Sequence, residues 1–425
     1  MPELLKLRWE PSLASGLPRR ERQGCEYQAY VPDPLMGRSF TFHAETAADI
    51  TDAERAVERL NTEARGLADS EAIARLLLRA EAVASSRIEG LEVGGRRLLR
   101  AQLAADIGED ARDVTAEDVL NNIEAMRWAV DTISAADDIT IDHILGIHER
   151  LLRGTELARY AGQLRDEQNW IGGSSYNPCS AAFIPPPPER VRALLDDLCE
   201  FANSDGLPAL AQAAIAHGQF ETIHPFVDGN GRTGRALIHV ILRRRGLTPV
   251  VVPPVSLVLA TWSDDYIAGL MASRHREPSE SAPAMEAINR WVELFASAMR
   301  RAVADAESYE QRVAEIQRRW RNRLGRVRAN SAVDRLIEAL PGAPIVTVQS
   351  AAALIERSEQ AVNEAIPRLV DARVLKQTTV GRRNRAFEAG DLIRAFTDLE
   401  RHLASPEGDT RFSRPDRRVP YRGTQ

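Results

Sequence analysis

The sequence predicts a mainly α-helical protein built from two or three domains. Aromatic residues make up only 5% of the chain, whereas alanine, leucine and arginine dominate long segments, and this composition favours helices. Apolar side chains also recur at helical spacing, most clearly over residues 70–88. The length of 425 residues exceeds that of a usual single core, which gives the domain estimate.

Charge and cysteine content limit the class of protein. The formal net charge of −6 argues against a chain that coats nucleic acid along its whole length. Cys25, Cys179 and Cys199 form no Cys-x-x-Cys pair, so we expect neither a disulfide framework nor a zinc site. The first ten residues lack a signal-peptide core, and no uncharged apolar run reaches membrane-spanning length. We therefore expect a soluble protein of the reducing cytoplasm.

The first well-marked element is the helix over residues 70–88. Its apolar positions follow the 3.6-residue period: Ile73, Leu76, Leu77, Ala80, Ala84 and Ile88. Gly90 is then expected to end it as the C′ residue.

A short β-hairpin is predicted between residues 169 and 188. This stretch is rich in glycine, β-branched and aromatic residues and ends in a run of prolines, which a helix would not tolerate. Its first strand contains Trp170, Ile171, Gly172 and Gly173.

Two further helices flank the most informative segment of the chain. An apolar helix over residues 210–223 leads into His224. A second helix begins at the turn that follows, continues over residues 236–245 and ends at Gly246. His217 and Tyr266 are expected to be packed core residues.

The segment between these helices combines groups suited to phosphate chemistry. His224 has a near-neutral side chain that suits a general base, and Asp228 can hold a divalent cation such as Mg²⁺. A turn at the start of the second helix directs N–H groups at an anion, and two arginines three residues apart can reach phosphate oxygens. The predicted phosphate-binding residues are Gly229, Asn230, Gly231, Arg232, Thr233, Gly234 and Arg235.

The alternative is that His224 is an ordinary core histidine and that Gly229-Asn230-Gly231 is an ordinary turn. Isolated residues would fit that interpretation. The base, the carboxylate, the turn and the arginines together favour a catalytic site.

The segment resembles the signature of the Fic family, His-Pro-Phe-x-Asp/Glu-Gly-Asn-Gly-Arg-x-x-Arg, and matches all its fixed positions. The resemblance implies a Fic helical bundle that transfers AMP from ATP, with Mg²⁺, to a Ser, Thr or Tyr hydroxyl of a target protein or of the enzyme itself. Some relatives transfer other phosphate-linked groups or remove AMP, so these activities remain alternatives.

Two other segments resemble regulatory and docking parts of the same family. Ser85 to Gly90 is similar to the inhibitory motif Ser/Thr-x-x-x-Glu-Gly/Asn, which implies that Glu89 pairs with Arg235 and obstructs the γ-phosphate site. The other interpretation of Glu89 is a solvated carboxylate at a helix end. The hairpin at residues 169–188 resembles the Fic flap, which implies pairing with an extended target segment; an ordinary surface hairpin is the alternative.

The C-terminal third has a different pattern. Residues 306–330 are arginine-rich and predict an exposed linker helix. Three short helices over residues 331–340, 346–355 and 359–370 precede two strands around a basic turn at residues 381–385. This order resembles a winged helix-turn-helix domain. DNA binding by such a regulator, and protein docking or homodimerisation, both stay open.

These observations divide the chain into an N-terminal helical region with the inhibitory helix, a Fic catalytic core, the linker, the winged-helix-like domain and a disordered tail. The expected boundaries are 1–110, 111–305, 306–330, 331–405 and 406–425.

Overall fold

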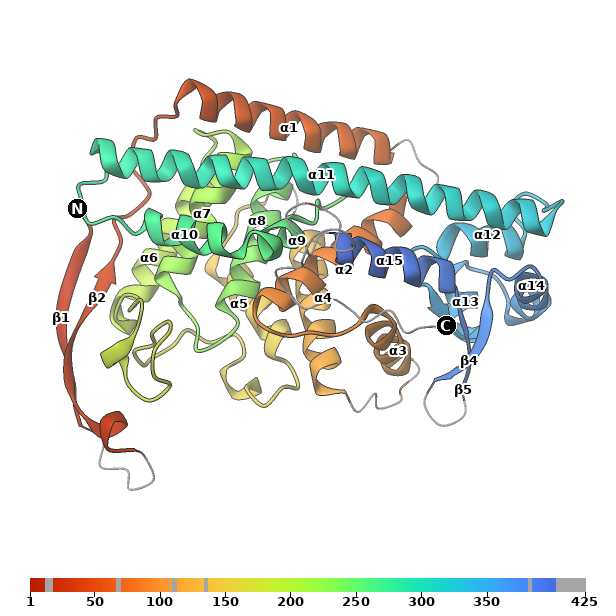
Figure 1. The fold of residues 1–425 in the computed structure, drawn as a ribbon, viewed down its shortest axis with the longest axis horizontal. Coiled ribbons are helices and arrows are strands. Elements are labelled where there is room, and N and C mark those ends of the chain that lie inside the picture. Colours follow the sequence, from red (N-terminus) through yellow and green to blue (C-terminus); the bar gives the residue numbers. More distant parts are fainter. Residues whose placement is uncertain are drawn as a thin grey trace. The chain divides into compact units, whose positions relative to one another are not determined.

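The structure, a computed structural model, describes residues 1–11, 18–65, 70–106, 108, 113–133, 137–380 and 384–402. The described chain is mainly helical, as predicted (Figure 1). It forms two compact units. The first contains residues 1–54, 128–247 and 264–297, and the second contains residues 55–127, 248–263 and the chain from 298 onward.

The first unit is organised around a pair of packed helices, α7 and α8. Its elements are β1 (Glu3–Trp9), β2 (Cys25–Val31), α5 (Ile141–Leu152), α6 (Pro188–Asn203), α7 (Ala209–Ile223), α8 (Asn230–Arg244) and α10 (Ser263–Ser273). Helices α1 (Ala44–Arg65), α4 (Val114–Thr132) and α11 (Ala282–Leu324) contribute residues to both units. All residues of α7 are buried, which confirms the predicted core helix before His224.

An N-terminal β-hairpin is the main element that the sequence did not reveal. Strands β1 and β2 pair antiparallel, with Glu3 opposite Val31, so the region expected to be helical begins with strands. A disulfide joins Cys25 at the start of β2 to Cys179. The expectation of unpaired cysteines is therefore wrong, because folding brings together residues 154 positions apart. Because the expectation of a reducing compartment depended on unpaired cysteines, the cysteines no longer support it.

The predicted hairpin at residues 169–188 is present in a minimal form. Ile171 and Phe183 make an antiparallel bridge, with Ile171 N donating to Phe183 O at 2.8 Å. Gly172 and Gly173 have φ angles of 74° and 76°, and a Cβ at Gly173 would lie 2.3 Å from Ser180 O. Glycine is therefore required for the turn to pack against the returning chain.

The second unit contains the predicted helix α2 (Ser70–Ile88) and the C-terminal elements. Its other helices are α3 (Gly95–Asp106), α9 (Val255–Thr261), α12 (Ala332–Ala339), α13 (Val348–Leu354), α14 (Glu359–Asp371) and α15 (Gly390–His402). Its strands are β3 (Ile345–Val346), β4 (Lys376–Val380) and β5 (Asn384–Glu388), in the antiparallel order β3-β5-β4. The predicted succession of three helices and two strands is observed, and α15 follows it.

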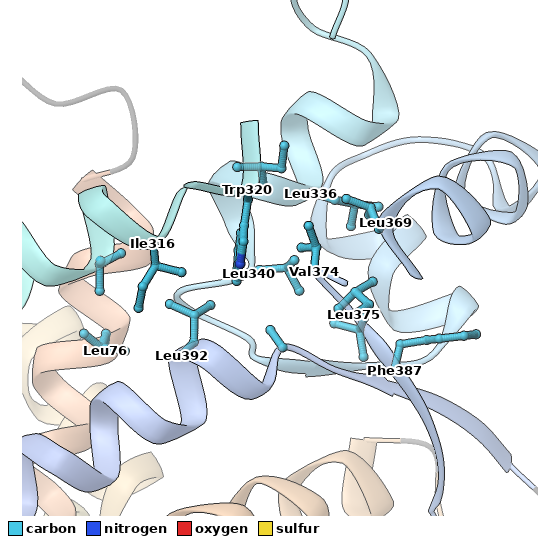
Figure 2. Close-up of a cluster of buried hydrophobic side chains, with 14 of the residues drawn as sticks. Leu76, Ile316, Trp320, Leu336, Leu340, Leu369, Val374, Leu375, Phe387 and Leu392 are labelled. Carbon is cyan, nitrogen blue, oxygen red and sulfur yellow. The ribbon is translucent and has the colours of Figure 1, made fainter. Parts of the chain in front are cut away.

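A single hydrophobic cluster joins α2 to the C-terminal elements (Figure 2). It includes Leu76 of α2, Ile316 and Trp320 of α11, Leu340 after α12, and Phe387 of β5. The stretch expected to be an exposed linker is thus the second half of the continuous helix α11, and one face of it is buried. The arginines that suggested exposure occupy its other positions.

Within the described ranges, no helix combines the length and apolar character that crossing a bilayer requires. The basic turn at 381–383 and the tail predicted to be disordered lie outside the described residues.

Candidate active site

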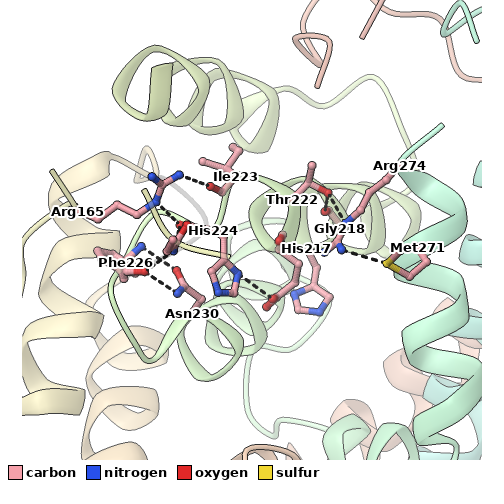
Figure 3. A network of polar contacts seen from close by, with 12 residues as sticks. Arg165, His217, Gly218, Thr222, Ile223, His224, Phe226, Asn230, Met271 and Arg274 are labelled. Atoms are coloured by element: carbon pink, nitrogen blue, oxygen red, sulfur yellow. Dashed lines mark hydrogen bonds and ion pairs between the residues drawn. The ribbon is translucent and has the colours of Figure 1, made fainter. Parts of the chain in front are cut away.

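The candidate site is formed by the loop that joins α7 to α8. Helix α7 ends at His224, which has left-handed backbone angles of φ 49° and ψ 61° and donates its N–H to Phe220 O at 2.9 Å. This conformation is unfavourable for a residue with a Cβ, so the surroundings must hold it. The side chain of His224 is 20% exposed, although its Nδ1 atom is buried; Figure 3 shows the ring near Asn230.

A buried carboxylate accompanies the histidine. Glu221 Oε2 lies 4.0 Å from His224 Nδ1, and the Glu221 side chain is 8% exposed. A Cβ at Gly234 would come within 2.7 Å of Glu221 Oε1, so glycine in α8 makes room for this carboxylate. The sequence analysis missed Glu221, although its position three residues before His224 indicates the same face of α7.

The start of α8 depends on two adjacent residues. Gly229 has a φ of 77°, and a Cβ there would lie 2.8 Å from Leu151 Cδ2. The amide of Asn230 accepts a hydrogen bond from Phe226 N at 2.8 Å and donates one to Phe226 O at 2.9 Å. The Asn230 side chain therefore closes the loop, and its contact with phosphate stays a prediction.

The arginines and the carboxylate predicted to bind phosphate and metal lie at the first turns of α8. Arg232 Nη2 is 3.2 Å from Asp228 Oδ2, and Asp228 is 50% exposed. Arg235 is 1% exposed. Arg232 Nε and Thr233 Oγ1 are buried without a hydrogen-bond partner in the structure. Buried donors of this kind usually bind a ligand or water, which supports an anion site here.

The residues present suit a magnesium ion that arrives with a polyphosphate. The described residues contain no group of three or more His, Cys, Asp or Glu side chains able to hold a metal by themselves. Mg²⁺ usually binds proteins through one or two carboxylates and completes its shell with phosphate oxygens and water. The half-exposed carboxylate of Asp228, beside Arg232, matches that requirement.

His148 supports the loop from α5, and the sequence analysis did not identify it. It stacks on Phe226 with ring centroids 3.7 Å apart, accepts a hydrogen bond from Gly162 N at its Nδ1, and contacts Asp228 O through Nε2 at 3.0 Å. Because Nδ1 accepts, Nε2 carries the proton and donates to Asp228 O. Burial lowers the pKa of His148 to about 4, so the ring is neutral.

His217 and Tyr266 are core residues, as predicted. His217 Nε2 lies 2.8 Å from the Tyr266 hydroxyl, and burial lowers the pKa of His217 to about 3.

The residues predicted to form a flap lie in the same unit as the α7–α8 loop, and the preceding Asn169 contacts that loop. Trp170 Nε1 donates to Ser174 O at 2.6 Å, and its ring packs edge-on against Trp9 of β1. Arg274 places its guanidinium 3.7 Å from the centre of the Phe183 ring and donates to Glu221 O at 3.2 Å. The hairpin is thus packed on both β1 and the end of α7.

The segment predicted to be inhibitory, residues 85–90, has the expected local structure. Ser85 is fully buried at the end of α2, Glu89 is exposed just beyond it, and Gly90 has a φ of 81°. Asn122 of α4 donates to Ser86 Oγ at 2.9 Å, which fixes the last turn of α2. Glu89 belongs to the second unit and Arg235 to the first, so their pairing stays a prediction.

Comparisons with known proteins identify the type of domain. Residues 138–242 match the Fic/DOC family, and residues 47–131 match its N-terminal region, described as Fic/DOC family N-terminal. The chain therefore carries a Fic/DOC-type region that includes the α7–α8 loop.

Curated relatives cover part of the chain. It is 28% identical over 247 residues to protein adenylyltransferase fic-1 of Caenorhabditis elegans, covering 55% of this chain and 46% of the relative. It is 33% identical over 161 residues to protein adenylyltransferase Fic of Drosophila melanogaster, covering 37% and 30%. The matched part thus spans less than half of each relative.

A solved structure agrees with the fold. A Fic family protein from Desulfovibrio desulfuricans G20 superposes with a TM-score of 0.50 at 21% identity, over 83% of this chain and 98% of that protein.

Proposed function

We propose that this chain is a protein adenylyltransferase that moves AMP from ATP to a Ser, Thr or Tyr hydroxyl of a target protein or of itself. The observation that carries the proposal is the α7–α8 loop, in which a partly exposed left-handed histidine precedes a helix start with buried, unpartnered donors on Arg232 and Thr233. The curated relatives named protein adenylyltransferase support the same reaction.

The proposed reaction is an in-line displacement at the α-phosphate of ATP. The hydroxyl oxygen of the target forms a bond to phosphorus while the bond to the β-phosphate oxygen breaks, and pyrophosphate leaves. His224 accepts the hydroxyl proton, and the carboxylate of Glu221, 4.0 Å from Nδ1, stabilises the imidazolium that forms. The backbone N–H groups at the start of α8, from Gly229 to Gly231, bind phosphate oxygens, and Arg232, Thr233, Gly234 and Arg235 line the site of the outer phosphates.

Mg²⁺, when bound, would neutralise charge on the phosphates. Asp228 is the residue that would hold it, and the Asp228–Arg232 ion pair at 3.2 Å would then rearrange. Target docking is assigned to the flap residues Trp170, Ile171, Gly172 and Gly173, and restraint of the enzyme to Glu89, with Ser85 fixing the turn that carries it.

The exposed side chains of α14 do not favour binding of this helix in a DNA groove. The exposed residues of this helix include Glu359, Gln360, Asn363, Glu364, Arg368 and Asp371. The acidic side chains outnumber the single arginine, whereas a helix in a DNA groove faces phosphates on both sides. We therefore do not propose a DNA-binding regulator as the main function.

The proposed function is tested by replacing His224, the proposed general base. His224→Ala should bind ATP nearly normally and transfer AMP slower by on the order of two to four decades, because the proton acceptor is lost. Transfer is measured by mass spectrometry after incubation with each labelled nucleotide and a cell lysate, which also reveals the nucleotide preference. His43→Ala is the control, since His43 is an exposed histidine of the same unit. Labelling by His224→Ala at the wild-type rate would overturn the mechanism.

A further inference from the structure

The backbone carbonyls of residues 224–226 all accept hydrogen bonds from one segment that precedes them in the chain. His224 O accepts from Arg165 Nε at 2.9 Å and from Asn169 Nδ2 at 3.2 Å. Pro225 O accepts from Arg165 N at 3.0 Å, and Phe226 O accepts from Asn169 Nδ2 at 3.0 Å. Figure 3 shows Arg165 reaching the carbonyl groups of Ile223 and His224.

These bonds decide which way the loop presents its polar groups. A carbonyl oxygen facing a polyphosphate would repel it, whereas N–H groups attract it. Arg165 and Asn169 donate to the carbonyl oxygens of residues 224–226, so these oxygens are already occupied by hydrogen bonds and are less free to face a phosphate. The same bonds fix the left-handed backbone of His224, from which the direction of its ring follows.

Arg165 also donates hydrogen bonds to the base of the flap. It is 4% exposed, and it donates to Glu167 O at 3.0 Å and to Pro186 O. These carbonyls precede the first strand of the hairpin and follow its second. One buried guanidinium therefore holds both ends of the flap and the carbonyl of His224. Burial lowers the pKa of Arg165 to about 10, so it remains charged at neutral pH.

We propose that Arg165 and Asn169 are positioning residues that fix His224 for proton transfer and tie its orientation to the flap. The inference rests on the proposed adenylyl transfer for its kinetic consequence. A target segment bound on the flap would thus meet a histidine whose direction the base of the same flap sets. Neither side chain contacts the reacting atoms.

The test compares two neighbouring amides. Asn169→Ala removes one donor to His224 O and one donor to Phe226 O, while Arg165 and Asn230 still donate to these carbonyls. Gln168→Ala removes a donor to Pro185 O and Asn169 O in the flap base alone. Asn169→Ala should lower kcat for AMP transfer at least roughly tenfold while the Kd for ATP changes little, because the loss falls on the oriented transition state. Gln168→Ala should keep kcat near wild type.

A second readout separates this inference from the proposed reaction. The ring signals of His224 in histidine-labelled protein, identified by their loss in His224→Asn, are recorded by NMR without nucleotide or target. Asn169→Ala should shift or broaden them and Gln168→Ala should not. If wild-type protein transfers no AMP, the proposed function fails, yet the ring signals still test the positioning. Unchanged ring signals in Asn169→Ala, or equal losses in both variants, would overturn it.

Arg165→Lys serves as a further variant with the charge kept. A lysine ammonium is a point donor and cannot replace the planar fork that reaches carbonyls on several segments. We expect kcat to fall at least as far as in Asn169→Ala and the His224 signals to move the same way. A lysine variant with wild-type kcat and ring signals would contradict the role of Arg165.

Discussion

At the residue scale, the backbone conformation of His224 determines which groups surround its ring. The left-handed conformation at φ 49° turns the chain out of α7 three residues after Glu221, whose carboxylate lies 4.0 Å from the His224 ring. A helical residue at position 224 would instead continue α7 into the apolar core. The strain of order 1 kcal/mol in such a residue is offset by the hydrogen bonds to its carbonyl.

Two buried histidines make stability depend on pH. Burial lowers the pKa of His148 to about 4 and that of His217 to about 3, below the unfolded value near 6.5. The unfolded chain therefore binds protons between these values that the folded chain does not. The contribution of these histidines to the free energy of unfolding should be constant above pH 6.5. It should decline as the pH falls toward 4, by on the order of 3 kcal/mol for His148 alone.

Urea unfolding at a series of pH values between 7.5 and 4.5 measures this decline. His148→Gln should be less stable at pH 7 but lose less on acidification, because the titrating ring is gone. The exposed His43→Gln should follow the wild-type slope. An identical pH dependence in wild type and His148→Gln would show that protonation of His148 does not contribute.

At the element scale, local signals predicted helices such as α2 and α7 and the strands β4 and β5, but they missed the hairpin of β1 and β2. Helix α2 has the predicted bounds, residues 70–88, because its apolar period and Gly90 are local features of the sequence. Helix α7 was equally clear. The hairpin of β1 and β2 was missed because its strands are mostly half-exposed and its partners, including the Cys25–Cys179 link, are distant in sequence.

Some residues of the candidate site could likewise be predicted from the sequence, and others could not. The motif residues from His224 to Arg235 were recognisable because they are contiguous. Arg165, Asn169 and His148 were not, since their contacts to the loop span 55 to 80 positions. Only the fold brings them together, so no spacing rule could have assigned their roles.

Disruption of the predicted flap should affect the binding of a protein target more than the binding of nucleotide. Ile171→Pro removes the N–H that bonds to Phe183 O at 2.8 Å and should disrupt the bridge. We expect the KM for a protein target to rise roughly tenfold, because the edge that would pair with a target segment loses its shape. Nucleotide affinity should be nearly unchanged. The conservative Ile171→Val keeps the N–H and should behave as wild type; parallel losses of ATP binding and target binding in the proline variant would contradict the assigned role.

At the scale of the whole molecule, the C-terminal elements are part of the structure that holds α2. Arg100 of α3 donates to Glu388 Oε1 of β5 at 2.9 and 2.6 Å, and Glu388 is 3% exposed. A Cβ at Gly342, after α12, would lie 3.2 Å from Ala72 Cα in α2. The sequence suggested a separate domain behind a linker, because these contacts join positions more than 250 residues apart.

Arg79 makes the most direct polar connection between α2 and the C-terminal elements. Its buried Nη2 donates to Gln102 Oε1 at 2.9 Å and to Gly342 O at 3.3 Å. Since Glu89 follows the end of this helix, loosening α2 should weaken any restraint that Glu89 exerts. Arg79→Met should then raise AMP incorporation about fivefold, the low end of usual coupling between sites. Arg75→Met is the control, because Arg75 pairs with Glu71 within the same helix.

The double variant decides whether the effect acts through Glu89. Glu89→Gly should itself raise self-labelling and target labelling, because it removes the carboxylate proposed to compete with the γ-phosphate for Arg235. Arg79→Met added to Glu89→Gly should give little further increase, since a restraint already removed cannot be weakened again. Rates are measured at equal ATP, with circular dichroism to confirm folding. Additive gains would place the effect of Arg79 elsewhere, and an unchanged rate in Glu89→Gly would leave Glu89 as a solvated carboxylate at the end of α2.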